Sequence, residues 1–367
     1  MRDHDLELKG VSKTAPGLAA LAPTDVVVEA GEHVALLEHG DGAAATLMRI
    51  AAGFLAPDIG RVVFRGRDLT DRPPAERPTR WVATGLGLFA ASIAEDVAWG
   101  LPATVGGRTE RREAALAMLA RHGLAEWADR PAADLGEAAA VVVALLRAVA
   151  GRPSLLLLDR PFLGVPVGER GELRDLLDRL RRETGVAILE RCDAPDEAVA
   201  HADRIALFHR HRLIRTDTPD RLRSAPISVA TARLIGEVCV LPGRLVAIEG
   251  TGGRVETALG VWSGAMPEAL ALGTPVAVAF RPECLELVDL DRSPGGSLNR
   301  FEADFVDRRP EGATVRLRFA AAGLVLTARR LDRGLHRPSL GARAALGVAV
   351  EDTWILPVEE GDGHDGA

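Results

Sequence analysis

Four consecutive leucines that end in an acid, Leu155 to Asp159, constrain the fold more than any other segment of this chain. A run this apolar predicts a strand of a parallel sheet that is covered on both faces. Around it, short apolar segments alternate with segments of helical period, which predicts an α/β domain with a parallel-rich sheet. Strands are expected at 4–10, 24–29, 34–37, 61–64, 155–159, 186–190 and within 204–216, and helices from Thr46 and at 108–123, 134–150, 168–183 and 195–202.

The pattern of the sequence changes after Pro226. Short apolar segments at 276–280, 314–319 and 324–328 are separated by Gly and Pro turns, which is typical of a small all-β barrel or sandwich. The length of 367 residues also favours two domains. The acidic, glycine-rich segment 359–367 is expected to fray.

Composition excludes several classes of protein. The formal net charge is −7 and there is no basic run, which argues against a nucleic-acid partner. The three cysteines have no C-x-x-C spacing, which predicts neither a zinc site nor a disulfide framework and suits a reducing cytoplasm. The longest apolar stretch, 138–146, is far shorter than the roughly 20 residues of a membrane-spanning helix. We therefore expect a soluble or peripherally attached protein without a signal peptide.

Candidate metal ligands and nucleophiles are few. His209 and His211, with Cys192, could suggest a metal, but two histidines at i, i+2 on a hairpin with no carboxylate between them make a poor ligand set. A solvated turn is the expected structure there, and no metal is expected. The serines have no His or Asp neighbours in a pattern that would support nucleophilic catalysis.

Taken in chain order, many segments resemble the ATP-binding subunits of ABC importers. The resemblance begins at Gly31-Glu-His-Val-Ala-Leu-Leu and Leu47-Met-Arg-Ile-Ala-Ala-Gly-Phe-Leu-Ala-Pro-Asp. After residue 225 the chain resembles the β-rich regulatory tail of the spermidine/putrescine, maltose and ferric-iron type subunits. The other matching segments are Gly66-Arg-Asp-Leu-Thr, Pro73-Pro-Ala-Glu-Arg, Ile93-Ala-Glu-Asp-Val-Ala-Trp-Gly-Leu, Leu155-Leu-Leu-Leu-Asp, Ala202-Asp-Arg-Ile-Ala, Thr218-Pro, Ile235-Gly-Glu, Leu241-Pro-Gly and Arg281-Pro-Glu.

The resemblance implies a fold, a location and partners. It implies a P-loop NTPase-like ABC nucleotide-binding domain at 1–225, with a helical subdomain at about 88–150, and then an OB/TOBE-like barrel at 226–367. Such subunits lie on the cytoplasmic face of the cell membrane, bound to the permease subunits of an importer. They pair as homodimers or as heterodimers, here with an intact ABC subunit. In the family, the stretch 89–101 borders the groove that receives the coupling helix of the permease.

The phosphate loop of the family reads G-x-x-x-x-G-K-[ST], and its backbone amides, lysine and hydroxyl hold phosphates and magnesium. The matching segment here, from position 38 to position 46, reads Glu-His-Gly-Asp-Gly-Ala-Ala-Ala-Thr. Glu38 replaces the first glycine of the motif, and Ala43 replaces the last glycine. Ala44 replaces the lysine, and Ala45 replaces the residue whose hydroxyl binds magnesium. The remaining members of this vestigial loop are Gly40, Asp41, Gly42 and Thr46.

Two acids of the loop oppose phosphate binding. Glu38 and Asp41 place carboxylates where phosphates would lie, and at about 5 Å, with an effective dielectric near 20, each charge pair repels by on the order of 3 kcal/mol. The only lysines of the chain, Lys9 and Lys13, belong to the first strand and cannot replace the missing one. The alternative interpretation is an ordinary strand–loop–helix connection, in which acids are favourable at the helix N-terminus.

The remaining catalytic positions of the family are also changed. The Walker B aspartate is present as Asp159 and would bind magnesium if any is retained, but the catalytic glutamate is Arg160, which cannot act as a base. The Q-loop glutamine falls on Thr84 and the switch histidine on Asp193. We therefore expect no catalytic residue and no bound ATP or magnesium. Because a half-buried guanidinium needs a carboxylate, Arg160 is expected to pair with Asp159, Asp41 or Glu38.

The signature motif, L-S-G-G-Q in the family, reads Leu135, Gly136, Glu137, Ala138 and Ala139. The serine hydroxyl is absent, and Glu137 lies at a helix N-terminus that should face the γ-phosphate of a partner. The alternative interpretation is an acid that caps a helix beginning at Ala138.

Three functions remain open from the sequence. The first is a pseudo-ATPase, a silent scaffold or regulatory subunit of an importer complex. The second is a divergent but functional ATP-hydrolysing importer subunit, in which case ATP and magnesium would be bound. The third is a soluble sensor whose β-rich domain recognises a small ligand. Nucleotide binding separates the first two, and association with a permease separates the first from the third.

Overall fold

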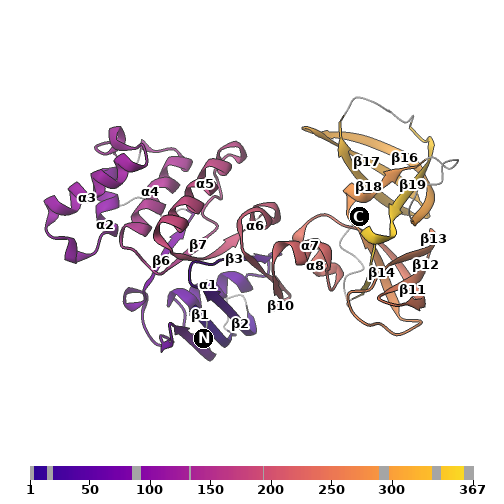
Figure 1. Ribbon diagram of the computed structural model, residues 1–367, viewed down its shortest axis with the longest axis horizontal. Coiled ribbons are helices and arrows are strands. Elements are labelled where there is room, and N and C mark those ends of the chain that lie inside the picture. Colours follow the sequence, from indigo (N-terminus) through magenta and orange to yellow (C-terminus); the bar gives the residue numbers. More distant parts are fainter. Residues whose placement is uncertain are drawn as a thin grey trace. The chain divides into compact units, whose positions relative to one another are not determined.

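The computed structural model describes residues 4–14, 20–84, 92–131, 134–192, 194–288, 297–332 and 340–358. The chain divides into two compact units, Met1–Pro219 and Asp220–Ala367, and each is described by itself (Figure 1). The division lies six residues before the boundary expected at 225, because helix α7 (Pro219–Ser224) goes with the second unit. No helix within the described ranges has the length and apolar character needed to cross a membrane.

The first unit is built on a six-stranded sheet of order β10-β9-β3-β8-β7-β6. The strands from β9 to β6 are parallel, and β10 is antiparallel to β9. Their bounds are β3 (His33–Glu38), β6 (Thr79–Ala83), β7 (Leu155–Asp159), β8 (Ala187–Cys192), β9 (Arg204–His209) and β10 (Arg212–Asp217). The parallel-rich sheet expected from the sequence is therefore present, with β6 as a strand that the apolar pattern did not indicate.

The leucine run occupies β7 and is fully buried. Leu155 and Leu157 belong to a core with helix α1 (Ala43–Ala52), whereas Leu156 and Leu158 belong to a core with the helices on the opposite face. Successive side chains of a strand point to opposite faces, so a strand between two cores must be apolar at every position. Burying each leucine contributes roughly 1.5–3 kcal/mol to the free energy of unfolding.

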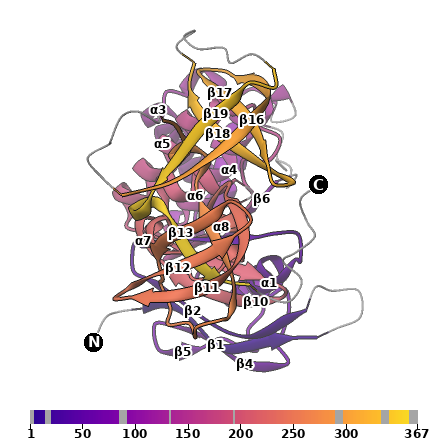
Figure 2. The same cartoon turned by 90° about the vertical axis from the view of Figure 1, so that its right-hand side faces the viewer.

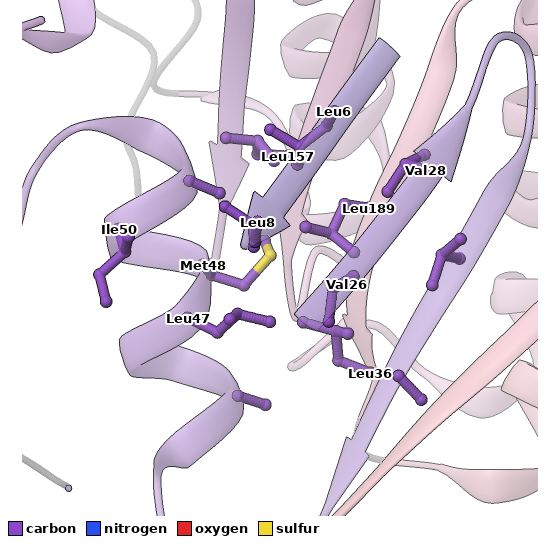
Figure 3. Close-up of a cluster of buried hydrophobic side chains, with 14 of the residues drawn as sticks. Leu6, Leu8, Val26, Val28, Leu36, Leu47, Met48, Ile50, Leu157 and Leu189 are labelled. Atoms are coloured by element: carbon purple, nitrogen blue, oxygen red, sulfur yellow. The ribbon is translucent and has the colours of Figure 1, made fainter. Parts of the chain in front are cut away.

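Helix α1 is held between the parallel sheet and a second, antiparallel sheet of order β2-β1-β4-β5. That sheet consists of β1 (His4–Lys13), β2 (Leu21–Glu29), β4 (Ile59–Phe64) and β5 (Arg67–Asp68). Figure 3 shows Leu47 and Met48 of α1 facing Leu8, Leu157 and Leu189 from the strands. The helix begins at Ala43, three residues before the expected start at Thr46, and this packing fixes its N-terminus against the ends of the parallel strands.

The expected helical subdomain contains α2 (Ile93–Gly100), α3 (Arg108–Arg121) and α4 (Glu137–Ala150). These helices share one core with α5 (Val167–Thr184), which follows β7. A shorter helix, α6 (Pro195–His201), follows β8. Figure 1 shows α2, α3 and α4 grouped beside α5. The N-terminus of α4, which carries the signature-like residues, therefore lies on a different part of the unit from α1.

The second unit begins with α7 and α8 (Val229–Ile235) and continues as β structure. A closed barrel has the order β11-β12-β13-β20-β14, and a five-stranded sheet has the order β15-β19-β16-β17-β18 (Figure 2). The barrel strands are β11 (Cys239–Glu249), β12 (Gly252–Thr257), β13 (Gly260–Ala265), β14 (Pro275–Phe280) and β20 (Trp354–Pro357). The sheet strands are β15 (Glu286–Leu287), β16 (Leu298–Glu311), β17 (Thr314–Ala321), β18 (Leu324–Leu331) and β19 (Arg343–Ala349).

One aromatic core joins the barrel to the sheet. The rings of Trp262 and Phe280 in the barrel stack with centroids 5.6 Å apart, and Phe301 of β16 lies 5.4 Å from Trp262. Stacked aromatic pairs add to the hydrophobic contribution of their buried area. The β-rich region expected after Pro226 is present from β11 onward, after helix α8, and it contains a sheet in addition to a barrel.

Candidate functional site

The loop between β3 and α1 places two carboxylates at the N-terminus of α1. Glu38 ends β3, and Gly40 and Gly42 have φ angles of 68° and 75°, which let the loop turn sharply. Asp41 Oδ1 accepts a hydrogen bond from the backbone N–H of Ala43 at 3.0 Å, and Glu38 Oε2 accepts one from Ala44 at 2.8 Å. The N-terminal amides of a helix are donors that a bound phosphate could use, and here the carboxylates of the chain itself occupy two of them.

The side chains at the end of this loop are small and enclosed. Ala43 and Ala44 have no exposed surface, and both belong to the core around α1. Ala44 and Ala45 provide neither a cation nor a hydroxyl group at the first turn. Thr46 is 3% exposed and its N–H continues the helix by donating to Gly42 O at 3.0 Å. The loop is thus a packed connection between a strand and a helix.

Asp41 also links the loop to the turn between β9 and β10. Its Oδ2 accepts from the backbone N–H of His211 at 2.7 Å. Arg210 and His211 have φ angles of 48° and 65°, an unusual conformation for residues with side chains. Among the described residues, no group of three or more His, Cys, Asp or Glu side chains could hold a metal ion. Of the two histidines, His211 contacts the loop, and it does so through its backbone N–H.

Arg191 connects the two acidic positions of the site. It lies on β8, opposite Asp159 on β7 in one register and opposite Leu36 on β3 in the other. Its Nε donates to Asp159 Oδ1 at 2.7 Å, and its Nη1 lies 3.3 Å from Glu38 Oε1. All three side chains are largely buried, with exposed fractions of 16% for Arg191, 17% for Asp159 and 7% for Glu38. One guanidinium therefore lies between two carboxylates that stand at the ends of the strands on either side of β8.

The environment of Glu38 shifts its protonation. Burial raises the pKa of Glu38, the hydrogen bond from Ala44 and the charge of Arg191 lower it, and the neighbouring Asp41 raises it again. The net shift of the pKa is upward, because desolvation of the carboxylate is the largest contribution. Because one oxygen of Glu38 accepts from Ala44 and the other contacts Arg191, this carboxylate stabilises the fold of the loop.

The arginine that pairs with Glu38 and Asp159 is Arg191, whereas the sequence indicated Arg160. Arg160 has a φ of 53°, and its backbone N–H donates to Arg191 O at 3.0 Å. Its carbonyl accepts a hydrogen bond from Thr84 Oγ1, so Arg160 holds the end of β7 through its backbone. The apolar pattern of the sequence ends this strand at 190, whereas β8 extends to Cys192 and places Arg191 level with Asp159.

Thr84 N–H donates to Asp159 O at 3.4 Å, beside the end of β6. Asp193, at the switch-histidine position, lies outside the described residues, as does Phe89 of the stretch 89–101.

The signature-like residues do not form a comparable arrangement. Helix α4 begins at Glu137 with Gly136 as its N-cap, one residue before the expected start at Ala138. Leu135 is half-buried, and Glu137 is exposed. A Cβ on Gly164, in the loop after β7, would lie 3.6 Å from Glu137 Oε2. The Glu137 carboxylate therefore lies against a loop of its own chain.

Sequence comparisons place this architecture among known transport proteins. The family model described as ABC transporter matches residues 21–163. The chain is similar to a spermidine/putrescine import ATP-binding protein of Pseudomonas aeruginosa, with 30% identity over 97% of this chain and 98% of the relative. It is also similar to an Fe(3+) ions import ATP-binding protein of Pseudomonas fluorescens, with 32% identity over 83% of this chain and 85% of the relative.

Solved structures agree on the fold of the first unit. An ATP-binding cassette of an ABC transporter in its ADP conformation has a TM-score of 0.54 and 20% identity, over 61% of this chain and 96% of that one. The cbiO1 protein from Clostridium perfringens has a TM-score of 0.55 and 23% identity, over 60% of this chain and 90% of that one. The P-loop NTPase-like ABC fold expected from the sequence is confirmed for the first unit.

Proposed function

Because the chain belongs to the ABC transporter family, among the ATP-binding proteins of importers, we propose that it is a pseudo-ATPase: a scaffold or regulatory subunit of an importer that neither binds nor hydrolyses ATP. The observation that carries this proposal is the loop before α1, where Glu38 and Asp41 accept hydrogen bonds from Ala44 and Ala43. In this family, the same amides hold the phosphates of ATP.

Three properties of the loop oppose Mg²⁺·ATP. Its amides are already hydrogen-bonded to carboxylates, and each carboxylate would repel a phosphate by on the order of 3 kcal/mol at about 5 Å. Ala44 and Ala45 supply no lysine and no magnesium-binding hydroxyl. Charge-assisted hydrogen bonds contribute roughly 1.5–3 kcal/mol each, whereas micromolar binding requires about 8 kcal/mol in total. The residues present therefore do not fit magnesium and the triphosphate.

The residues around Asp159 also lack the chemistry of hydrolysis. The position after Asp159 is Arg160, which stays protonated and cannot orient a water as a general base. Asp159 itself is paired with Arg191, so a magnesium ion would have to displace a guanidinium that is 16% exposed. We propose that no residue of this chain is catalytic and that no ATP, magnesium or other cofactor is bound.

The proposed partner is a permease, which would hold the chain at the cytoplasmic face of the cell membrane. Helices α2 and α3 carry a surface pocket of about 780 Å³ that is lined by Trp99, Arg108, Arg111 and Arg112 among others. Trp99 is 73% exposed, so its ring offers an apolar surface to a docking segment beside the three arginines. This pocket supports docking of a permease segment on the helical part of the first unit.

In an ABC dimer, each ATP lies between the phosphate loop of one subunit and the signature motif of the other. This chain contributes Ala44 to one such site and Glu137 to the other, so it completes neither. We propose that it pairs with itself or with an intact homologous subunit, and that in the second case the mixed dimer has no complete ATP site.

The proposal is tested by titrating the full chain with Mg²⁺·ATP in a calorimeter, with an intact homologous subunit as the positive control. We expect no saturable heat up to millimolar ATP. Saturable binding below about 100 µM would overturn the proposal and favour a divergent active ATPase, since binding to the folded state would also raise the Tm. Failure to copurify with a permease encoded beside it would favour the sensor instead.

A further inference from the structure

Helix α6, which follows β8, contributes almost no buried apolar side chain to the first unit. Only Ala198 of its seven residues is buried, and neither of the two cores around β7 includes a residue of α6. Because nucleating a helix is costly, a helix this short is not stable on its own in water. Contacts other than apolar packing must therefore hold α6 in place.

Ion pairs between side chains of α6 and α5 supply these contacts. Glu197 uses both of its carboxylate oxygens: Oε1 accepts from Arg170 Nη1 at 2.9 Å, and Oε2 accepts from Arg174 Nη2 at 2.6 Å. At the other end of α6, His201 Nδ1 lies 3.2 Å from Asp178 Oδ2. Although burial raises the pKa of Glu197, the hydrogen bonds from the two arginines lower it below its usual value. The ionised Glu197 is therefore the main connection of α6 to α5.

The thiol of Cys192 lies beside this connection. Cys192 is the last residue of β8 and is 4% exposed. It lines a cavity of about 80 Å³ together with Glu197 and the two arginines that pair with it. Burial raises the pKa of the thiol well above its usual value, and a thiol that is not ionised reacts slowly. The reactivity of Cys192 therefore reports whether α6 covers the end of β8.

Position 186 provides a comparison on the same strand. Val186 immediately precedes β8, is 1% exposed and belongs to the core that α5 shares with α2, α3 and α4. Because side chains alternate along a strand, positions 186 and 192 face the same side of the sheet. They differ in what covers them, which is an apolar core at position 186 and a charged connection at position 192.

We propose that α6 is an electrostatic latch, closed by the contacts of Glu197 with Arg170 and Arg174, which opens locally while the sheet stays folded. Opening removes α6 from the carboxyl end of β8 and exposes Cys192 to solvent. A segment with few buried apolar contacts opens at a lower cost in free energy than the core of the same unit. The latch does not depend on whether the chain binds ATP, because none of its contacts involves the loop before α1.

The test follows alkylation of each cysteine of the full chain by the neutral reagent iodoacetamide, with peptide mass spectrometry as the readout. Val186→Cys adds a thiol of nearly the size of valine, so one molecule gives both rates. We expect Cys192 to react at least about tenfold faster than the thiol at position 186, because only unfolding of the core exposes the latter. Urea below the onset of unfolding should speed alkylation steeply at position 186 and hardly at Cys192, since local opening exposes little surface. Equal rates, or equal dependence on urea, would overturn the proposal.

Two variants assign the latch to Glu197. Glu197→Gln keeps the size of the side chain and removes its charge, so alkylation of Cys192 should be at least about tenfold faster. Glu172→Gln, on the exposed side of α5, is the matched control and should leave that rate unchanged. Hydrogen exchange of the α6 amides, such as the Ala198 N–H that donates to Ala194 O, should rise by the same factor in Glu197→Gln. Faster alkylation without faster exchange would show altered thiol chemistry and refute the latch, as would an unchanged rate at Cys192.

Discussion

Two helix N-termini of the first unit carry acids where the family binds phosphate, and they differ in how far the fold has incorporated them. At α1, Glu38 and Asp41 accept hydrogen bonds from Ala44 and Ala43. At α4, Glu137 is exposed and its carboxylate forms no hydrogen bond or ion pair within the described residues. The acids at α1 are part of the hydrogen-bonding of the fold, whereas the acid at α4 is a charge on the surface.

The difference follows from what surrounds each helix end. The N-terminus of α1 lies where β3, β7 and β8 end, so a carboxylate there meets both the helix amides and Arg191. Taking charges out of water is costly unless they are paired, and the pairing with Arg191 is what makes Glu38 and Asp159 tolerable there. The end of α4 is open to solvent, so an acid needs no partner. Where phosphate is absent, an enclosed helix N-terminus therefore needs other groups to pair with its amides, whereas water can do so at an exposed one.

The largest expected effect comes from rebuilding the loop before α1. The triple variant Glu38→Gly, Ala44→Lys, Ala45→Ser should bind Mg²⁺·ATP at least about 100-fold more tightly than the unmodified chain, because it removes one repulsion and adds two charge-assisted contacts. Ala44→Lys alone should gain nothing, since the new ammonium would pair with Glu38. Calorimetric titration of the three proteins measures this, and strong ATP binding by the single variant would contradict the role given to Glu38.

The next effect concerns the arginine that neutralises the loop. Arg191→Met leaves Glu38 and Asp159 enclosed without their common partner, and should lower the free energy of unfolding by about 2–3 kcal/mol. Arg182→Met, on the exposed side of α5, is the matched control and should change it by less than about 0.5 kcal/mol. Urea denaturation followed by circular dichroism measures both. Equal losses for the two variants would show that Arg191 is not a special partner.

Much of this fold follows from the sequence because its signals are local. The leucines of β7, the helical period of α5 and the glycine-separated strands of the second unit identified those elements to within a few residues. The strand β6 was missed because Thr79, Arg80 and Trp81 give no apolar run, and only pairing with β7 makes that segment a strand. Tertiary pairing, which no local pattern encodes, decided that case.

The candidate site was harder to predict than the fold. The positions of Glu38, Asp41 and Asp159 followed from motif spacing, but the partner of two of them came from a different strand. Arg191 is 153 residues from Glu38 and 32 from Asp159, so only the order of the parallel strands brings the three together. Arg160 was the obvious candidate by sequence distance, and the left-handed backbone at that position gives it a different role.

A smaller effect is a dependence on pH at Glu38. Burial raises the pKa of Glu38 in the folded chain above the unfolded value of 4.5. Folding therefore favours the protonated carboxyl, and this contribution to the free energy of unfolding is fully present below pH 4.5. The contribution is lost as the pH rises through the pKa of the folded chain, because the buried group then ionises. The variant Glu38→Gln lacks this loss and should gain stability relative to the unmodified chain between about pH 4 and pH 7.

Glu197 provides the control of opposite sign for this dependence. Burial raises the pKa of Glu197, but the hydrogen bonds from Arg174 and Arg170 outweigh it and the pKa is lowered. Its contribution to stability is therefore present above the unfolded pKa and is lost as pH falls, so Glu197→Gln should lose stability relative to the unmodified chain as pH rises. Urea denaturation across the pH range gives both trends, and parallel curves for the two variants would contradict the enclosed state of Glu38.

The smallest effect is expected at α4, and it is the one that most directly separates the two helix ends. Glu137 is the first residue of α4, where an exposed acid gains only a weak interaction with the helix dipole. Glu137→Ala should therefore change the free energy of unfolding by no more than about 0.5 kcal/mol, as for other surface substitutions. The double variant Gly136→Ser, Glu137→Gly, which restores two signature positions, should likewise fold with nearly unchanged stability, because nothing in the described chain depends on the carboxylate. If Glu137→Ala instead lost as much stability as Arg191→Met, the acid at α4 would be structural after all, through its approach to the loop at Gly164. Urea denaturation of the two α4 variants beside Arg191→Met, under one set of conditions, decides between these outcomes.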